Sequence, residues 1–337
     1  MKISKIPGLG SYGHYIDGVD FKNLSHEEWM EIGQLHMKGL VTILRDVSLT
    51  IEEYRYWMLK FGPFKSNYKR TMKVLYGKEL NELTSDVVDE SQHPFHKLLI
   101  EQGDVLLEKA PVMPVQYNSE LEWHSNESGT LTFTPGIALL GDKHMVGSST
   151  GFVQTVDWYE KQTESFRSEL DEMIVIHNFT PGGFTKIELE NQFIRDVMQT
   201  GFCPFNGSEI PLVMKSPGGI KGMHYSINTV SGIKGMSQQD SDKLFAKINK
   251  ELFTDEYIFD HWYQQDNDLL LFDNSITMHR RLGGDGSRLI HRIQFDCSHL
   301  LDGPWLPYYQ PEYLELYKQQ VREVVEMAEL SDFKLPD

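Results

Sequence analysis

The sequence has little cysteine, no long apolar run and a shortage of positive charge, and each shortage excludes a class of protein. Of its 337 residues only Cys203 and Cys297 are cysteines, which excludes a disulfide framework and a cysteine-rich metal site. The uninterrupted apolar runs, such as residues 269–272, are far too short to cross a bilayer. Residues 1–20 lack the apolar core of a signal peptide. We therefore expect a cytoplasmic protein without a membrane partner.

The charge balance is acidic. There are 32 lysines and arginines against 49 aspartates and glutamates, so the formal net charge is −17, and the basic residues are scattered. Nucleic-acid binding needs a clustered basic surface, so we expect no nucleic-acid partner. Apolar residues make up 40% of the chain, which indicates a folded protein with a sizeable core.

The N-terminal part has an α/β pattern. Apolar residues at helical spacing predict a helix over residues 24–40, with Ser25 as its N-cap. The β-branched run at 40–46 predicts a strand, and a capping-box signature at Thr50 and Glu53 begins a helix over 50–64.

From about residue 115 the pattern changes to short β runs separated by turn residues. Two helical stretches interrupt them, roughly 155–173 and 237–253, and a periodic segment at 313–330 predicts a closing helix. Many short strands with a few helices favour a β-sandwich or barrel decorated by helices, in an α+β or mainly β class. No linker divides the chain, so we expect one domain over 1–337. Its parts are an N-terminal α/β part to about 100, a β core over about 105–300 and the closing helix.

Two histidines stand beside β runs in unusual local contexts. His124 follows a tryptophan in "LEWHSNES", and His279 follows the strand and turn of "DLLLFDNSITMH". Two histidines and one carboxylate form the facial triad that binds iron and leaves three positions open. Each histidine alone is more often structural than a ligand, because the chain has 13 of them.

Two arginines follow shortly after His279. In "RLIHRIQF", Arg288 and Arg292 are four residues apart, and on a strand such residues face the same side. Guanidinium groups bind carboxylates in a bidentate manner, which suits a dicarboxylate cosubstrate. A pair of surface arginines on an edge strand is the alternative.

Five segments in order resemble the taurine dioxygenase (TauD/TfdA) family of iron(II)- and 2-oxoglutarate-dependent oxygenases. They are "VTILRDVSLTIEEYRYWMLKFGPF", "WHSNES", "GSSTGFVQTVDWYEKQ", "DNDLLLFDNSITMHRR" and "RLIHRIQF". The resemblance implies a double-stranded β-helix, or jelly roll, with helices around it.

The resemblance also implies the roles of individual residues. His124 and His279 would be iron ligands, and Thr150 and Arg288 would bind the distal carboxylate of 2-oxoglutarate. Arg292, which we group with the cosubstrate residues, matches an arginine that in some members contacts an anionic group of the substrate. The cofactor would be iron(II), and the co-reactants 2-oxoglutarate and dioxygen.

The sequence departs from the family at the third ligand. The family has Asp or Glu two residues after the first histidine, where this chain has Asn126. An amide oxygen can bind a hard cation, but it lacks the charge of a carboxylate and should hold iron(II) more weakly. Glu127 is the alternative ligand, and it would need a β-bulge to face the metal.

The sequence thus predicts an oxygenase that hydroxylates a small organic substrate and releases succinate and carbon dioxide. Arg292 suggests an anionic group on that substrate, and His224, Tyr225 and Asn228 lie in a segment that lines the pocket in relatives. Because of Asn126, a halogenase, a binding protein or a catalytically silent relative remains an alternative. The sequence leaves open whether the protein is a homo-oligomer.

Overall fold

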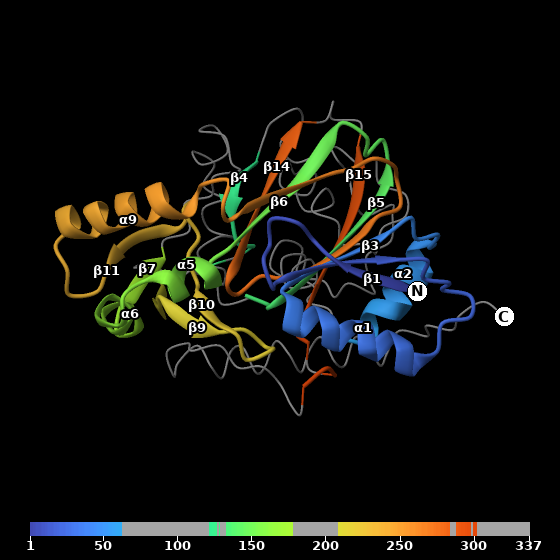
Figure 1. The fold of residues 1–337 in the computed structure, drawn as a ribbon, viewed down its shortest axis with the longest axis horizontal. Helices are drawn as coiled ribbons and strands as arrows, with labels where there is room; N and C mark the ends of the chain where they lie inside the picture. Colours follow the sequence, from blue (N-terminus) through green and yellow to red (C-terminus); the bar gives the residue numbers. More distant parts are fainter. Residues whose placement is uncertain are drawn as a thin grey trace, which may run out of the picture.

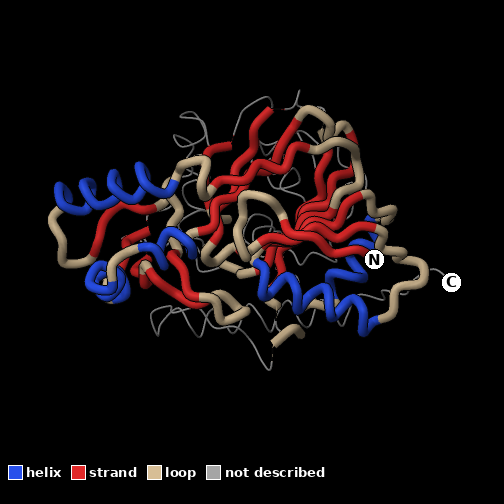
Figure 2. The backbone as a smooth tube through the Cα atoms, in the orientation of Figure 1, coloured by secondary structure: helices blue, strands red, loops and turns tan. Residues whose placement is uncertain are grey.

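The described part of the chain is a mixed α/β structure made mostly of sheet (Figure 1 and Figure 2). The structure is a computed structural model, and it describes residues 1–62, 121–126, 128, 133–177, 208–283, 288–297 and 299–301. The predicted closing helix at 313–330 lies outside the described residues. No helix in the described ranges is long and apolar enough to cross a membrane.

The largest sheet has six strands drawn from both ends of the chain. Their order is β1 (Lys2–Lys5), β2 (Gly13–Asp17), β3 (Val41–Arg45), β13 (Leu269–Asp273), β5 (Gly136–Lys143) and β15 (Leu289–Phe295). Only β2 and β3 are parallel, and helix α1 (His26–Gly39) makes the crossover that a parallel pair requires. All five residues of β13 are buried because this strand is covered on both faces.

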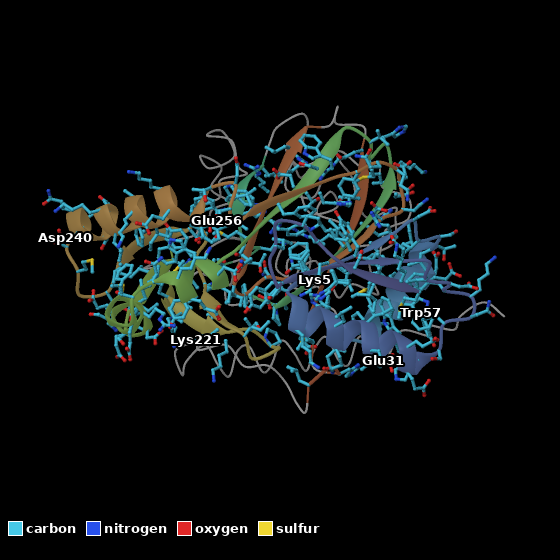
Figure 3. The ribbon with its side chains drawn as sticks, in the orientation of Figure 1. Lys5, Glu31, Trp57, Lys221, Asp240 and Glu256 are labelled. Atoms are coloured by element: carbon cyan, nitrogen blue, oxygen red, sulfur yellow. The ribbon has the colours of Figure 1, made fainter. Side chains whose placement is uncertain are left out.

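Helices α1 and α2 (Ile51–Leu59) cover one face of this sheet. Both begin with the predicted capping boxes, at Ser25 and Thr50. The helix expected over 50–64 ends at Leu59, since the backbone before Pro63 disfavours further helix. Between helices and sheet, Trp29 stacks on Phe61 at 4.5 Å and donates a 2.7 Å hydrogen bond to the carbonyl of Trp57. Trp57 lies on α2 and is labelled in Figure 3.

A second, antiparallel sheet has four strands. Their order is β12 (Ile258–Trp262), β6 (Ser148–Gln154), β14 (Thr277–Gly283) and β4 (Leu121–His124). Phe152 on β6 packs in one buried cluster with Leu139, Leu270 and Phe272 of the six-stranded sheet. The two sheets therefore face each other, and we call the region between these faces the inter-sheet space.

A lobe of smaller elements adjoins the four-stranded sheet, on the left of Figure 1. It contains the sheet of β11 (Val230–Ile233), β7 (Ile174–His177) and β8 (Ser208–Pro211), the pair β10 (Lys221–Met223) and β9 (Val213–Lys215), and helices α5 (Val156–Lys161), α6 (Glu164–Asp171) and α9 (Gln238–Leu252). Helix α9 confirms the helical stretch predicted at 237–253. The stretch predicted at 155–173 is two helices, because Gln162 is extended and Thr163 caps α6.

Candidate metal and cosubstrate site

His124 and His279 lie directly opposite each other on β4 and β14. Residues opposite each other in an antiparallel pair point to the same side of the sheet. The two imidazole centroids are 4.1 Å apart, with 47° between the ring planes. Two imidazoles on adjacent positions of one octahedral ion would have centroids about 4.5 Å apart, given metal–nitrogen distances of about 2.1 Å. The spacing of the two rings thus fits a shared divalent ion.

The surroundings keep His279 neutral. Its side chain is buried beside Phe272, with ring centroids 4.8 Å apart, and its Nδ1 atom has no hydrogen-bond partner. Burial, followed by the positive neighbours His124 and Arg292, lowers the pKa of His279 well below its usual value. A neutral imidazole keeps one unprotonated nitrogen, which is the form that binds a metal.

Asn126 is buried just beyond the end of β4, and Asn274 fixes its backbone. The amide N–H of Asn126 donates to Oδ1 of Asn274 at 2.8 Å, and Nδ2 of Asn274 donates to the carbonyl of Asn126 at 2.9 Å. The side-chain oxygen of Asn126 accepts a long hydrogen bond, 3.4 Å, from Nη1 of Arg292. Its Nδ2 atom is buried without a partner. The oxygen expected to face a metal is therefore shared with a guanidinium.

The described residues contain no cluster of three or more His, Cys, Asp or Glu side chains able to hold a metal. Glu127, the alternative third ligand, lies outside them. The donors that the structure does bring together are two imidazoles and the amide of Asn126. A ligand set of this kind suits a divalent transition ion, which accepts nitrogen ligands, better than calcium or magnesium.

Thr150 lies on β6 in a second polar cluster. Its Oγ1 atom is 2.9 Å from the hydroxyl of Tyr263, and both side chains are buried. Across the β6–β14 pair, Thr150 is opposite Arg281. Burial raises the pKa of Tyr263 to about 12, so its phenol keeps the proton. Two protonated hydroxyl groups therefore lie together beside Arg281 of β14.

Arg288 belongs to the same cluster, which we call the arginine corner: Thr150, Tyr263, Arg281 and Arg288. Its Nη1 atom is buried without a partner, and burial lowers its pKa, an effect that Tyr263 partly offsets. Burial and the charge of Arg288 lower the pKa of Arg281 to about 10. A buried guanidinium with an unpaired donor calls for an anion. The arginine corner thus fits a carboxylate.

Arg292 lies on β15, four residues after Arg288 and near the histidines. It pairs with Leu139 in register, and Ile290, between the two arginines, packs against the cluster of the inter-sheet space. The charge of Arg292 lowers the pKa of His279, whereas the charge of Arg288 lowers the pKa values of Tyr263 and Arg281. The two arginines therefore lie in different parts of the candidate site.

Sequence reasoning missed Tyr263, Arg281 and Asn274. Asn274 had a local signal, because Asp, Asn and Ser in a turn such as "DNS" often bond to the backbone through their side chains. Asp273 in the same turn does so: its Oδ1 atom accepts from the N–H groups of Ser275 and Ile276. Arg281 and Tyr263 had none, since their proximity to Thr150 depends on strand register.

The three suggested substrate residues have different surroundings. Tyr225 donates to Asn249 of α9 at 2.8 Å and packs in the core of the lobe. Asn228 accepts a 2.6 Å hydrogen bond from Ser226. His224 is buried and bonds to the carbonyl of Ser275, beside Asn274. Of the three, Tyr225 has a sufficient structural explanation.

Comparison with known proteins agrees with the resemblance in the sequence. The family model described as "Taurine catabolism dioxygenase TauD, TfdA family" matches residues 2–294. No match was found among curated proteins.

Solved structures with a similar fold include AAD-2 in complex with Mn(II) and N-oxalylglycine, with a TM-score of 0.61 and 17% identity over 92% of this chain and 100% of that one. A taurine dioxygenase from Burkholderia xenovorans gives a TM-score of 0.59 and 19% identity over 92% and 91% of the two chains. At these identities the structures establish likeness of fold. Because the family model spans nearly all of the sequence, including both histidines and both arginines of the site, the chain belongs to the taurine catabolism dioxygenase TauD, TfdA family.

Proposed function

We propose that the protein is an iron(II)- and 2-oxoglutarate-dependent oxygenase that hydroxylates a small organic substrate and releases succinate and carbon dioxide. We further propose that the two facing sheets form a double-stranded β-helix. The observation that carries the proposal is that His279 on β14 lies opposite His124 on β4. The same strand, β14, also places Arg281 opposite Thr150 on β6. One strand thus connects a candidate metal site with a candidate carboxylate site.

In this proposal His124 and His279 hold iron(II), and Asn126 or Glu127 supplies the third protein ligand. When bound, iron with 2-oxoglutarate and dioxygen supplies the oxidation that hydroxylates the substrate. Burial keeps His279 unprotonated and ready to bind. Asn274 holds the peptide at Asn126 in place through two hydrogen bonds.

Thr150, Tyr263 and Arg288 bind the distal carboxylate of 2-oxoglutarate in this proposal. Only one of the two hydroxyls can donate across the 2.9 Å contact between Thr150 and Tyr263, so the other keeps its hydrogen for the carboxylate. The unpaired Nη1 atom of Arg288 supplies a charge-assisted donor. Arg292, beside the histidines, contacts an anionic group of the substrate.

The second candidate is a relative with altered or no turnover, such as a binding protein or a halogenase. The observation in its favour is the hydrogen bond from Arg292 to Asn126, which engages the only side-chain oxygen that Asn126 has. In that case the chain would bind 2-oxoglutarate without hydroxylating a substrate.

Anaerobic loading with iron(II), followed by calorimetry with 2-oxoglutarate and a succinate assay in air, tests the proposal. His124→Ala and His279→Ala should each lose iron and all succinate formation, whereas His26→Ala, at an exposed histidine, should lose neither. Full iron occupancy in both variants would refute the metal assignment. Binding of 2-oxoglutarate without succinate, across a broad panel of substrates, would favour the second candidate.

The cosubstrate assignment has its own test. Arg288→Ala should weaken 2-oxoglutarate binding by about 2–5 kcal/mol, the usual cost of truncating one partner of a buried charge pair. Arg167→Ala, on α6, is the matched control and should bind normally. An unchanged affinity in Arg288→Ala would transfer the role to Arg292 or Arg281.

A further inference from the structure

A second pair of buried histidines, His177 and His224, lies outside the proposed metal site. His177 ends β7 and His224 follows β10, and both side chains are almost fully buried, with exposures of 0% and 1%. Their ring centroids are 5.2 Å apart. Neither ring contacts a described acid, and the proposed chemistry uses neither of them.

The hydrogen bonds of His224 fix its tautomer. Its Nδ1 atom lies 2.7 Å from the carbonyl oxygen of Ser275, which can only accept, so Nδ1 carries the hydrogen. Burial lowers the pKa of the ring to about 4, so the ring is neutral near pH 7. Its Nε2 atom is therefore a hydrogen-bond acceptor.

The same reasoning applies to His177. Its Nδ1 atom lies 2.8 Å from the hydroxyl of Thr229, and that hydroxyl donates its own hydrogen to the carbonyl of Ser226 at 3.2 Å. With the Thr229 hydroxyl donating to Ser226, Nδ1 of His177 is the donor, and its Nε2 atom is an acceptor. This Nε2 atom is buried and has no partner. Two neighbouring rings thus each present a lone pair, and an unpaired buried acceptor is unfavourable unless a donor meets it.

This pair adjoins the proposed metal site through short connections. Ser275, the partner of His224, directly follows Asn274, which holds Asn126. Ser226 accepts a 3.1 Å hydrogen bond from the backbone of Ser125, next to His124. The histidine pair and the proposed metal site are therefore close neighbours in the fold.

We propose that His177 and His224 recognise the substrate of the proposed oxygenase through a nitrogen group that carries at least two hydrogens, an amide or an amine. This inference rests on the proposed function and specifies its substrate class. One such group can donate to both Nε2 atoms at once, which a hydroxyl cannot do. A carboxylate or sulfonate offers no hydrogen and would face two lone pairs. Any anionic group of the substrate therefore belongs at Arg292, at another point of the same molecule.

Acetamide and acetate make a matched test, because they have the same shape and differ in whether they donate. The protein is labelled with 15N-histidine, loaded with zinc in place of iron, and saturated with 2-oxoglutarate. The Nε2 resonances of His177 and His224, assigned with His177→Asn and His224→Asn, are followed during titration with each compound. In both variants the asparagine amide can still donate to Thr229 or Ser275, which protects the fold, but the acceptor at Nε2 is gone.

We expect acetamide to shift both Nε2 resonances and acetate to shift neither. The dissociation constant of acetamide should rise at least tenfold in each variant, with 2-oxoglutarate binding unchanged. The proposal is wrong if acetamide leaves both resonances unmoved, if acetate moves them equally, or if zinc binds in a second equivalent that the variants lose. Failure of the wild-type protein to bind 2-oxoglutarate would refute the proposed function instead, and calorimetry detects that outcome separately.

Discussion

Asn126 is the residue at which this chain departs from its family, and Arg292 explains how the departure is accommodated. The guanidinium donates to the amide oxygen, so a neutral residue at 126 avoids a buried ion pair beside the proposed metal site. We predict that Asn126→Asp tightens iron(II) binding, because a carboxylate adds Coulomb attraction in a medium of low dielectric. Arg292 would compete for that carboxylate, so Asn126→Asp with Arg292→Gln should bind iron still more tightly. Anaerobic competition with a chelator measures both.

Glu127→Gln is the control for this prediction and should change iron affinity little. If Glu127→Gln removed the metal and Asn126→Asp had no effect, Glu127 would be the true ligand.

Tyr263 is one of the two residues of the arginine corner that sequence reasoning missed, and it provides a second prediction. Tyr263→Phe removes one of the two hydroxyls available to the carboxylate. We expect 2-oxoglutarate binding to weaken by about 1.5–3 kcal/mol, the typical value for a hydrogen bond to a charged group. The matched control is Tyr225→Phe, since that hydroxyl bonds to Asn249 instead. Calorimetry should show normal 2-oxoglutarate affinity for Tyr225→Phe; an equal loss in both variants would indicate general loosening of the fold.

At the scale of elements, the turn between β13 and β14 connects fold and site. Asn274 in this turn bonds to both backbone groups of Asn126 and to the carbonyl of Thr134 at 3.0 Å. We predict that Asn274→Ala lowers both stability, by about 1–3 kcal/mol for the buried groups left unpaired, and iron affinity, although Asn274 is no ligand. Urea unfolding and iron titration on the same samples measure the two effects.

A helix cap supplies the comparison for that variant. Ser25→Ala removes the N-cap of α1, and we expect it to cost about 0.5–2 kcal/mol of stability with iron affinity unchanged. Normal iron binding in Asn274→Ala would show that the turn supports only the fold.

The elements also show which features a sequence can predict. The caps at Ser25 and Thr50 and the apolar pattern of α9 depend on residues within a few positions, and these helices begin where they were expected. The break between α5 and α6 was missed because its cause is the extended backbone of one residue, Gln162. His124 and His279 were singled out individually, but their opposition depends on strand register between residues 155 positions apart, which local patterns do not encode.

At the scale of the whole molecule, buried neutral histidines make stability depend on pH. Burial lowers the pKa values of His36 and His224 to about 4, and lowers those of His177 and His279 as well. A group whose pKa is lower in the folded state takes up its proton at a higher pH in the unfolded state than in the folded state, so falling pH favours unfolding. The stability that it contributes is therefore complete above about pH 6.5 and decreases as the pH falls toward 4.

His36 is the best position at which to test this pH dependence, because it packs against Phe295 of the six-stranded sheet, away from the proposed ligands. We predict that wild-type protein loses about 2 kcal/mol more stability than His36→Leu between pH 7 and pH 5, from about 1.4 kcal/mol per unit of pKa difference. Asp273 acts in the opposite sense: burial raises its pKa to about 6, so its contribution is lost as the pH rises. Both proteins share Asp273, so the difference between their urea unfolding curves isolates His36. Parallel curves would mean that His36 is protonated without cost.

The six-stranded sheet has a consequence for how the protein is made. Strand β3, near the N-terminus, has β13 as its partner on one side, and β13 begins at residue 269. During synthesis β3 and β5 leave the ribosome long before the strand that joins them, and both carry buried apolar side chains. Non-local pairing of this kind slows folding and leaves unpaired, apolar strand edges exposed, which can associate with other chains. We expect nascent chains that end before residue 269 to be captured by chaperones or to aggregate, and release to follow once β13 has emerged.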